Sequence, residues 1–147
     1  SGAVTLEILR DRQLLQLELV AQELGNSETD RVVLWAGLLL QAPHRALAVQ
    51  QGIEPDGVYI SLWWKGSPAA RYRIRATHRI LEVDGQATPD LDAFLAAVEG
   101  KQNGASVRVR TVDLAGKIAA KTLKLDTSFW PTSELKRESG GWVRIAR

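Results

Sequence analysis

The stretch VVLWAGLLL, residues 32–40, is a continuous apolar run that is interrupted only by Gly37. A run of this length between polar segments is typical of a buried β-strand, so we predict a strand that is interrupted at the glycine. A glycine there lets backbone N–H groups turn inward and cradle an anion, such as a chain-terminal carboxylate. The residues after Gly37 would then offer an unpaired strand edge, to which an extended peptide can add itself.

Short helices and strands are predicted on the C-terminal side of this run. Pro43 suits the first turn of a helix that Gly52 ends. Residues 58–64, VYISLWW, predict a strand, and Ser67-Pro68 predicts the start of a helix of one or two turns. Residues 79–83 predict a further strand, which the tight turn Asp84-Gly85 ends.

The clearest helix is predicted within TPDLDAFLAAVEG, residues 88–100. Thr88 is the candidate N-cap and Pro89 the first helical residue. An apolar stripe follows at the spacing i, i+3, i+4 and i+7, formed by Leu91, Phe94, Leu95 and Val98. This stripe predicts that one face of the helix packs on a sheet or lines a groove.

Two segments alternate between apolar and polar residues on both sides of a turn, which predicts hairpins over 3–20 and 105–125. The two are alike in length and in their basic turn flanks. We therefore interpret residues 1–24 as the end of a preceding, similar module, although a chance similarity of two amphipathic hairpins remains an alternative. The last residues, 127–147, show no clear period, and we expect Phe129-Trp130-Pro131 to pack back on the domain.

Composition places the chain among ordinary soluble globular proteins, at 45% hydrophobic and 24% charged residues. A formal net charge of +2 is too small for a polycation that binds nucleic acid. The absence of cysteine excludes a disulfide framework, a thiol nucleophile and a thiolate metal site. No apolar run reaches the roughly 18 residues typical of a membrane span, so we expect no membrane association. The chain starts with Ser1-Gly2 and lacks methionine, and we expect it to be cut from a longer protein.

The residues offer little for catalysis. His44 and His78 are the only histidines, and no serine lies in the context of a nucleophile elbow. The histidines and carboxylates also lack metal-ligand spacing, so we predict no enzyme activity, no metal and no cofactor in this chain. Trp63-Trp64-Lys65 and the arginines that follow are typical of a single-strand nucleic-acid binder. The alternative, which we favour, is that one tryptophan packs inward and the arginines form the solvated side of a loop.

The ordered motifs resemble the PDZ domain in the form carried by HtrA-type serine proteases. The resemblance rests on WAGLLL (35–40), GVYISLWWKGSPAARYRI (57–74), RILEVDGQATPDLDAFLAAV (79–98) and the closing hairpin. It is strongest to the last PDZ module of the multi-PDZ HtrA-like proteases known from fungal nuclei. The resemblance implies a nuclear, intracellular location and a serine protease domain that lies N-terminal to this chain.

The resemblance also implies a fold and a site. The fold would be α+β: a bent antiparallel sheet or partly open barrel of five to six strands with two main helices over residues 32–126, an extra N-terminal hairpin over 1–24 and a C-terminal extension over 127–147. Its carboxylate-binding loop matches Trp35, Ala36, Gly37 and Leu38, and its peptide-receiving strand matches Leu38, Leu39 and Leu40. The candidate groove-facing helix residues are Leu91, Leu95 and Val98.

The implied function is non-catalytic: a module that binds extended or C-terminal apolar peptides and presents substrates to, or regulates, the attached protease. Its partners would include the protease domain, neighbouring PDZ modules and a second copy in a homo-oligomer. The alternative is a degenerate PDZ that joins domains or subunits without binding free peptide.

Two departures from the family pattern favour this alternative. Where many relatives have Gly-Leu-x-x-Gly-Asp, this chain has Arg73-Ile74-Arg75-Ala76-Thr77-His78. Because positive φ is costly for Thr77, we expect a different local backbone there. The helix 43–51 follows the binding strand almost at once, and we expect it to shorten or cover the groove.

Overall fold

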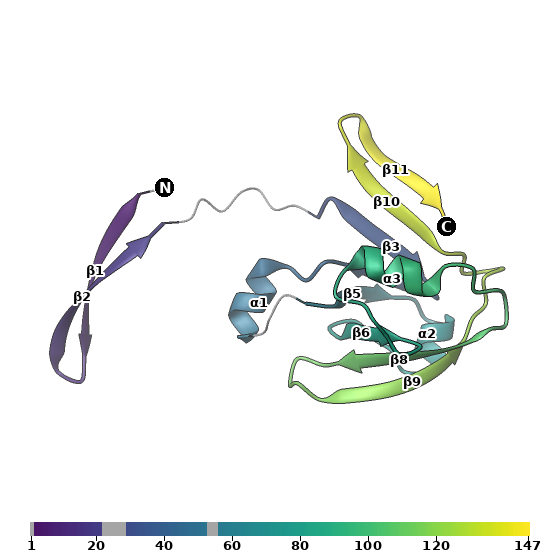
Figure 1. Cartoon of the computed structure of the whole chain (residues 1–147), viewed down its shortest axis with the longest axis horizontal. Helices are drawn as coiled ribbons and strands as arrows, with labels where there is room; N and C mark the ends of the chain where they lie inside the picture. Colours follow the sequence, from purple (N-terminus) through teal and green to yellow (C-terminus); the bar gives the residue numbers. More distant parts are fainter. Residues whose placement is uncertain (1, 22–28, 53–55) are drawn as a thin grey trace.

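The structure, a computed structural model, describes residues 2–21, 29–52 and 56–147. Residues 22–24 of the predicted first hairpin segment therefore lie outside the described residues. The strands of the described part form two sheets, one of two strands and one of nine. Figure 1 shows the small sheet as a purple hairpin and the large sheet together with the helices.

The two-stranded sheet is the predicted N-terminal hairpin. Strands β1 (Ala3–Arg10) and β2 (Gln13–Val20) pair in antiparallel register, with Leu6 opposite Leu17. Asp11 and Arg12 in the turn both have positive φ, 53° and 63°, as a two-residue hairpin turn requires. One face of the hairpin carries only aliphatic side chains between its ends, and these are exposed or half-buried: Val4, Leu6, Ile8, Leu15, Leu17 and Leu19.

The nine-stranded sheet is antiparallel throughout, in the order β11-β10-β3-β4-β5-β6-β8-β9, with β7 paired to β6. Its strands are β3 (Arg31–Trp35), β4 (Leu38–Gln41), β5 (Val58–Trp63), β6 (Arg79–Val83), β7 (Gln86–Ala87), β8 (Ser106–Val112), β9 (Ile118–Lys124), β10 (Ser133–Glu138) and β11 (Gly141–Ala146). The predicted α+β class with an antiparallel sheet is confirmed. The five to six strands expected over residues 32–126 are too few, because residues 32–40 fold into two strands and Gln86–Ala87 forms the short β7, which gives seven strands, β3 to β9. The C-terminal extension adds the hairpin β10–β11 to the same sheet.

The helices begin and end close to the predicted positions. In α1 (Arg45–Gln51) the C-cap is Gly52, at φ 60°, and in α2 (Pro68–Arg71) the hydroxyl of Ser67 accepts a hydrogen bond from the Ala70 amide at 3.1 Å. The N-cap of α3 (Leu91–Val98) was predicted wrongly as Thr88. The carboxylate of Asp90 accepts the bond from the Ala93 amide at 2.8 Å instead.

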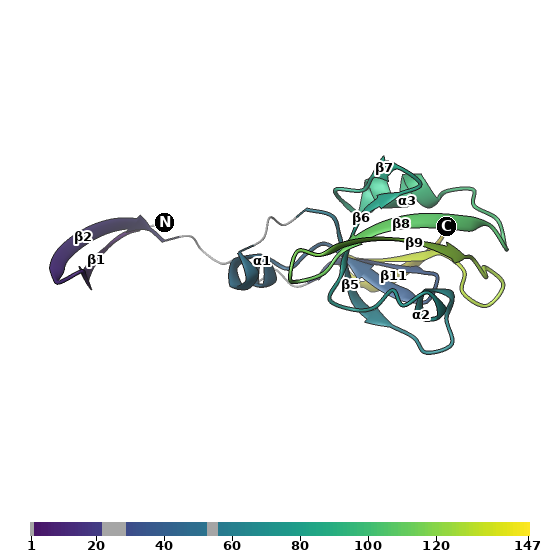
Figure 2. The same cartoon turned by 90° about the horizontal axis from the view of Figure 1, so that it is seen from below.

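Helix α3 covers the hydrophobic core of the large sheet (Figures 1 and 2). Phe94 is fully buried, and its ring meets that of Trp35 edge to face, with the centroids 5.3 Å apart. Further fully buried apolar side chains include Val33, Leu38, Leu40, Val58, Ile60, Ile74, Ile80, Val83 and Leu123. None of the helices in the described part of the chain has the length and apolar character that crossing a membrane requires.

Candidate peptide-binding site

The predicted carboxylate-binding loop is a tight two-residue turn. Ala36 and Gly37 both have positive φ, 50° and 77°, and Trp35 pairs directly with Leu38 across the turn. The carbonyl oxygen of Gly37 accepts a hydrogen bond from the Trp64 amide at 3.0 Å, and that of Ala36 accepts one from the Ala69 amide at 3.1 Å. The turn is thereby anchored to the segment between β5 and α2, and it reverses the chain direction.

Because the chain reverses at this turn, β4 lies antiparallel to β3. Strand β4 pairs with β3 on one edge, with Val33 opposite Leu40, and with β5 on the other, with Leu38 opposite Trp63. The prediction of an unpaired edge at residues 38–40 is therefore wrong. It failed because VVLWAGLLL was interpreted as one interrupted strand, whereas the positive φ of both Ala36 and Gly37 makes it a hairpin.

Strand β3 also contacts helix α3, which was predicted to form the far wall of the groove. Trp35 packs against Phe94, and Arg31 Nη2 lies 2.6 Å from an Asp92 carboxylate oxygen. The segment 31–35 thus lies beside β4 and reaches α3, which is the place where an added peptide strand was expected.

A buried carboxylate fixes β3 to the C-terminal hairpin. Glu134 on β10 is fully buried, and it accepts hydrogen bonds from Arg31 Nε at 2.6 Å and from Arg147 Nε at 2.9 Å. Burial by itself would raise the pKa of Glu134, but the hydrogen bonds from Arg147 and Arg31 outweigh it and hold the pKa below its ordinary value. The hydrogen bond from Arg31 likewise lowers the pKa of the exposed Asp92. These ion pairs form one network that connects α3 to β3, β3 to β10, and β10 to the C-terminal residue.

The residues proposed for the loop and the strand are mostly buried. Trp35, Ala36, Leu38 and Leu40 belong to the core, whereas Leu39 is half-buried on the opposite face of the sheet. Gly37 is enclosed as well, because a Cβ placed on it would lie 2.1 Å from the Cβ of Ser67. Residues 35–40 therefore lie next to one another inside the folded domain, and not along an open strand edge.

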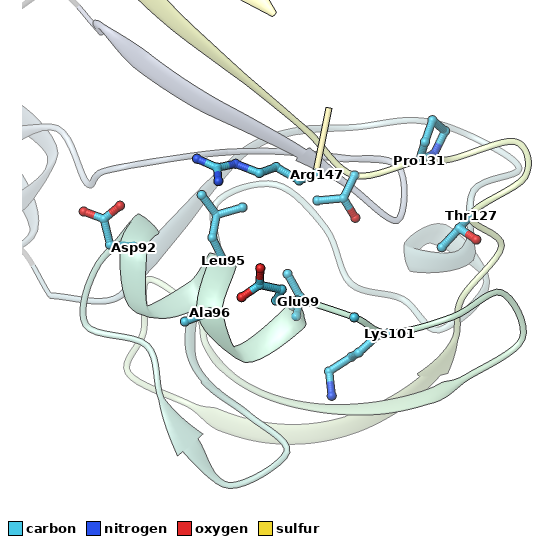
Figure 3. A pocket seen from close by; sticks show the side chains of 11 residues that line it. Asp92, Leu95, Ala96, Glu99, Lys101, Thr127, Pro131 and Arg147 are labelled. Atoms are coloured by element: carbon cyan, nitrogen blue, oxygen red, sulfur yellow. The ribbon is translucent and has the colours of Figure 1, made fainter. Parts of the chain in front are cut away.

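The residues proposed for α3 are divided between core and cavity. Leu91 and Val98 are buried in the core and Leu95 is half-buried, and Leu95 and Val98 also line a cavity of about 410 Å³ between α3 and the C-terminal extension. Figure 3 shows Arg147 extending over Leu95 from the opposite side, with Pro131 and Thr127 farther along the wall. The cavity carries charges of both signs, from Asp92, Glu99, Lys101 and Arg147.

Trp35, Gly37 and Leu38 line a second, smaller cavity of about 160 Å³. Its remaining walls come from Leu34, Trp64, Arg144 and the segment 129–131, and Pro131 also lines the larger cavity. Five of the nine predicted site residues therefore line one of two cavities, and the segment 127–132 of the C-terminal extension contributes to both cavities. Ala36, Leu39, Leu40 and Leu91 line neither.

The sequence interpretation did not find Arg31, Glu134 or Arg147, nor the hairpin β10–β11 that carries Glu134 and ends next to Arg147. A signal was present for the hairpin: Ser139-Gly140 separates two six-residue segments, Ser133–Glu138 and Gly141–Ala146, which is a typical two-strand pattern. The pairing of Glu134 with two distant arginines has no local signal, because Arg31 is 103 residues away.

The altered turn before β6 keeps a backbone suited to glycine. Arg73 and Thr77, at the positions where the family pattern has glycines, have φ of 59° and 72°. The expectation of a different local backbone is therefore wrong. The amide of Thr77 donates to the Ile60 carbonyl, and the Ile60 amide donates to the His78 carbonyl, both at 2.9 Å. These bonds from β5 hold the turn in its strained conformation.

Helix α1 does not lie where it would cover the groove. Figures 1 and 2 both show it at one end of the domain, apart from α3. The expectation that α1 covers the groove is not met, and β3 and the C-terminal extension contact α3 instead. Within residues 2–21, 29–52 and 56–147, no cluster of three or more histidine or carboxylate side chains forms a metal site.

Nearly the whole chain has named relatives, although no family profile matches it. It is 43% identical over 146 residues to Protease Do-like 7 of Arabidopsis thaliana, a match that covers 96% of this chain and 13% of that protein. It is 34% identical over 140 residues to Pro-apoptotic serine protease NMA111 of Yarrowia lipolytica, which covers 95% of this chain and 14% of that protein. The homologues of this chain are HtrA-like proteases.

The solved structure of the HtrA-type protease AlgW with a decapeptide shares the fold of part of this chain. The two are 22% identical, with a TM-score of 0.56 over 65% of this chain and 29% of the AlgW chain. The sequence relatives confirm the resemblance to HtrA-type proteases, and the AlgW structure supports the fold of the part that it covers. The chain itself spans only a small part, 13% to 14%, of these HtrA-like proteases.

Proposed function

We propose that this chain is a non-catalytic, PDZ-like module of an HtrA-like serine protease in which β3 takes the place of the bound peptide. The observation that carries the proposal is the pairing of β4 on both edges, by β3 and by β5. β-Augmentation needs a free row of backbone donors and acceptors, and neither edge of β4 offers one. The module would then join domains or subunits of the protease, and substrate capture at β4 is the second candidate.

Further contacts favour a permanent arrangement of β3. Arg31 bridges Asp92 and Glu134, so that α3 and β10 hold the start of the strand, while Trp35 in the core holds its end. Removing β3 from β4 would also leave the carboxylate of Glu134 buried with only the partners Arg147 and Lys136. A free peptide would have to offset the loss of these contacts before it gained any of its own.

The exposed face of the hairpin β1–β2 supports the same proposal. Its aliphatic residues form a surface that a module in a longer protein would bury, as β8 and β9 bury Val107, Val109 and Leu123 in this domain. We infer that the hairpin closes a preceding module. Leu17→Asp should therefore leave the unfolding of this chain unchanged and destabilise the longer protein; equal unfolding free energies in the longer protein would contradict the inference.

The function is tested by titrating the isotope-labelled chain with peptides that end in apolar residues. With β3 in place, the amide resonances of Leu39 and Leu40, which do not line the small cavity, should not shift at peptide concentrations up to about 1 mM, which corresponds to roughly 4 kcal/mol of binding free energy. The double variant Arg31→Gln, Glu134→Gln loosens β3 and should allow shifts at the same amides. Saturable shifts in the unaltered chain would favour substrate capture and contradict the structural role.

A further inference from the structure

An aromatic cleft lies on the outer side of the Ala36-Gly37 turn. It is lined chiefly by Leu34, Trp64, Phe129, Trp130, Pro131 and Arg144, around the cavity of about 160 Å³. Trp64 and Trp130 form a tilted pair with centroids 6.3 Å apart, and Phe129 is 81% exposed. Rings of this size left open to water are typical of binding surfaces, because they bury a large area at little cost in conformational entropy.

The charge at the cleft is positive and unpaired. Arg144 makes no ion pair with any of the residues that the structure describes, unlike Arg31, Arg79, Arg110 and Arg147. Lys65 follows Trp64 directly and is exposed. A ligand that places a carboxylate on Arg144 would gain a charge-assisted hydrogen bond without displacing an acidic side chain of the protein.

A buried hydroxyl near the cleft lacks a partner as well. Ser133 is 1% exposed, and its Oγ makes no hydrogen bond. It pairs with Leu34 across β3 and β10, so the two side chains lie on the same face of the sheet. This face is opposite to the one on which Trp35 meets Phe94 of α3.

We propose that this aromatic cleft binds an acidic segment of a partner protein that carries one large apolar side chain. The small cavity accommodates a single side chain, and Arg144 receives a neighbouring Asp or Glu. Because Phe129 and Trp64 leave the cleft open to solvent, the segment can continue in both directions and need not end there. A nucleic-acid strand would need a longer cationic track than Arg144 and Lys65 provide.

The proposal is tested with the peptide Ac-Gly-Asp-Phe-Asp-Gly-amide, followed through the indole N–H resonances of Trp64 and Trp130. Saturable shifts of both resonances are expected. Affinity should fall about fivefold for the Asp→Asn peptide or for Arg144→Gln, and about tenfold for Phe129→Ala, since these remove one ion pair and one ring contact. Phe129 is exposed, so its replacement leaves the core intact.

The matched control is Lys117→Gln, which removes the same charge from the β8–β9 turn at the other end of the strand order and should leave the affinity unchanged. Equal shifts with the Asp→Asn peptide, or no indole shift at all, would overturn the proposal. Tighter, salt-sensitive binding of an oligothymidylate at the same indoles would also overturn it, in favour of nucleic acid.

Discussion

Gly37 and Ser67 are in such close contact that a Cβ on Gly37 would lie 2.1 Å from the Cβ of Ser67 and 2.6 Å from its Oγ. The same glycine has φ of 77°, and its carbonyl is anchored by the Trp64 amide. Sterics and backbone conformation together require glycine at this position. The turn that brings β3 back along β4 is thus specified by the packing of α2 against it.

Gly37→Ala should lower the free energy of unfolding by about 3 kcal/mol, from left-handed strain and overpacking together. The control is Gly66→Ala, because Gly66 has φ of 80° but open space around its Cβ position. It should cost only about 1 kcal/mol, from strain alone. Urea denaturation followed by tryptophan fluorescence measures both. Equal losses would show that contact with Ser67 does not matter.

Thr77→Gly should raise the free energy of unfolding by about 1 kcal/mol. Thr77 is exposed and β-branched, so glycine at φ of 72° relieves backbone strain and forfeits little side-chain contact. Ala76→Gly is the matched control, because Ala76 has no positive φ and should lose roughly 0.5 kcal/mol on replacement. The pair therefore predicts opposite signs in thermal unfolding. If Thr77→Gly lowered the free energy of unfolding, the backbone at Thr77 would not be strained.

These two turns show what local sequence determines and what it does not. The N-cap at Ser67, the C-cap at Gly52 and the hairpins at 3–20 and 105–125 follow from residues within a few positions, and all were predicted correctly. The backbone at Thr77 is instead imposed by hydrogen bonds from Ile60, in a different strand. Residue propensities alone could not show that a neighbouring strand would enforce a costly φ.

The candidate site was predictable in part. The family resemblance pointed to the loop around Gly37 and to the helix residues Leu95 and Val98, and the structure places Gly37 at one cavity and the two helix residues at another. It did not reveal that the groove edge is filled, because this depends on Arg31 meeting Asp92 and Glu134 over long sequence separations. Alternation of apolar residues predicts which face of a strand is buried, but not which strand becomes its neighbour.

Glu134→Gln should destabilise the domain by roughly 3 kcal/mol at pH 7, because it removes the negative charge that Arg31 and Arg147 share in a buried setting. Glu82→Gln removes one partner of the surface pair with Arg110 and should cost less than about 1 kcal/mol. Denaturant unfolding of the two variants measures both changes in the free energy of unfolding. Similar changes for Glu134→Gln and Glu82→Gln would contradict a stabilising role for the buried network.

The lowered pKa of Glu134 also gives the domain an acid-sensitive stability. A carboxylate whose pKa is lower in the folded state contributes stability that is complete above its unfolded pKa, about 4.3. That contribution is lost as the pH falls through the folded pKa. The unaltered chain should lose stability as the pH falls below about 4, and Glu134→Gln should lose less over the same range. Parallel pH profiles would argue against a depressed pKa.

His78 should titrate below the ordinary histidine pKa of about 6.5. Burial lowers its pKa first, and the nearby positive charge of Lys121 lowers it further. Its folded state favours neutral imidazole, so this contribution to stability is complete above pH 6.5 or so and is lost as the pH falls toward the folded pKa. Proton NMR of the imidazole ring measures the shift, and Lys121→Gln should raise the pKa. A measured pKa of His78 above the ordinary histidine value would show that burial does not dominate its titration.

The central claim is that β3, and not open solvent, lies along the edge of β4. In a two-residue hairpin the residues that flank the turn form a hydrogen-bonded pair, so the amides of Leu38 and Leu40 point toward β3 and that of Leu39 toward β5. Amide hydrogen exchange, resolved residue by residue, tests this directly. The account predicts that Leu38 and Leu40 exchange as slowly as Leu39; fast exchange of Leu38 and Leu40 beside a protected Leu39 would contradict it.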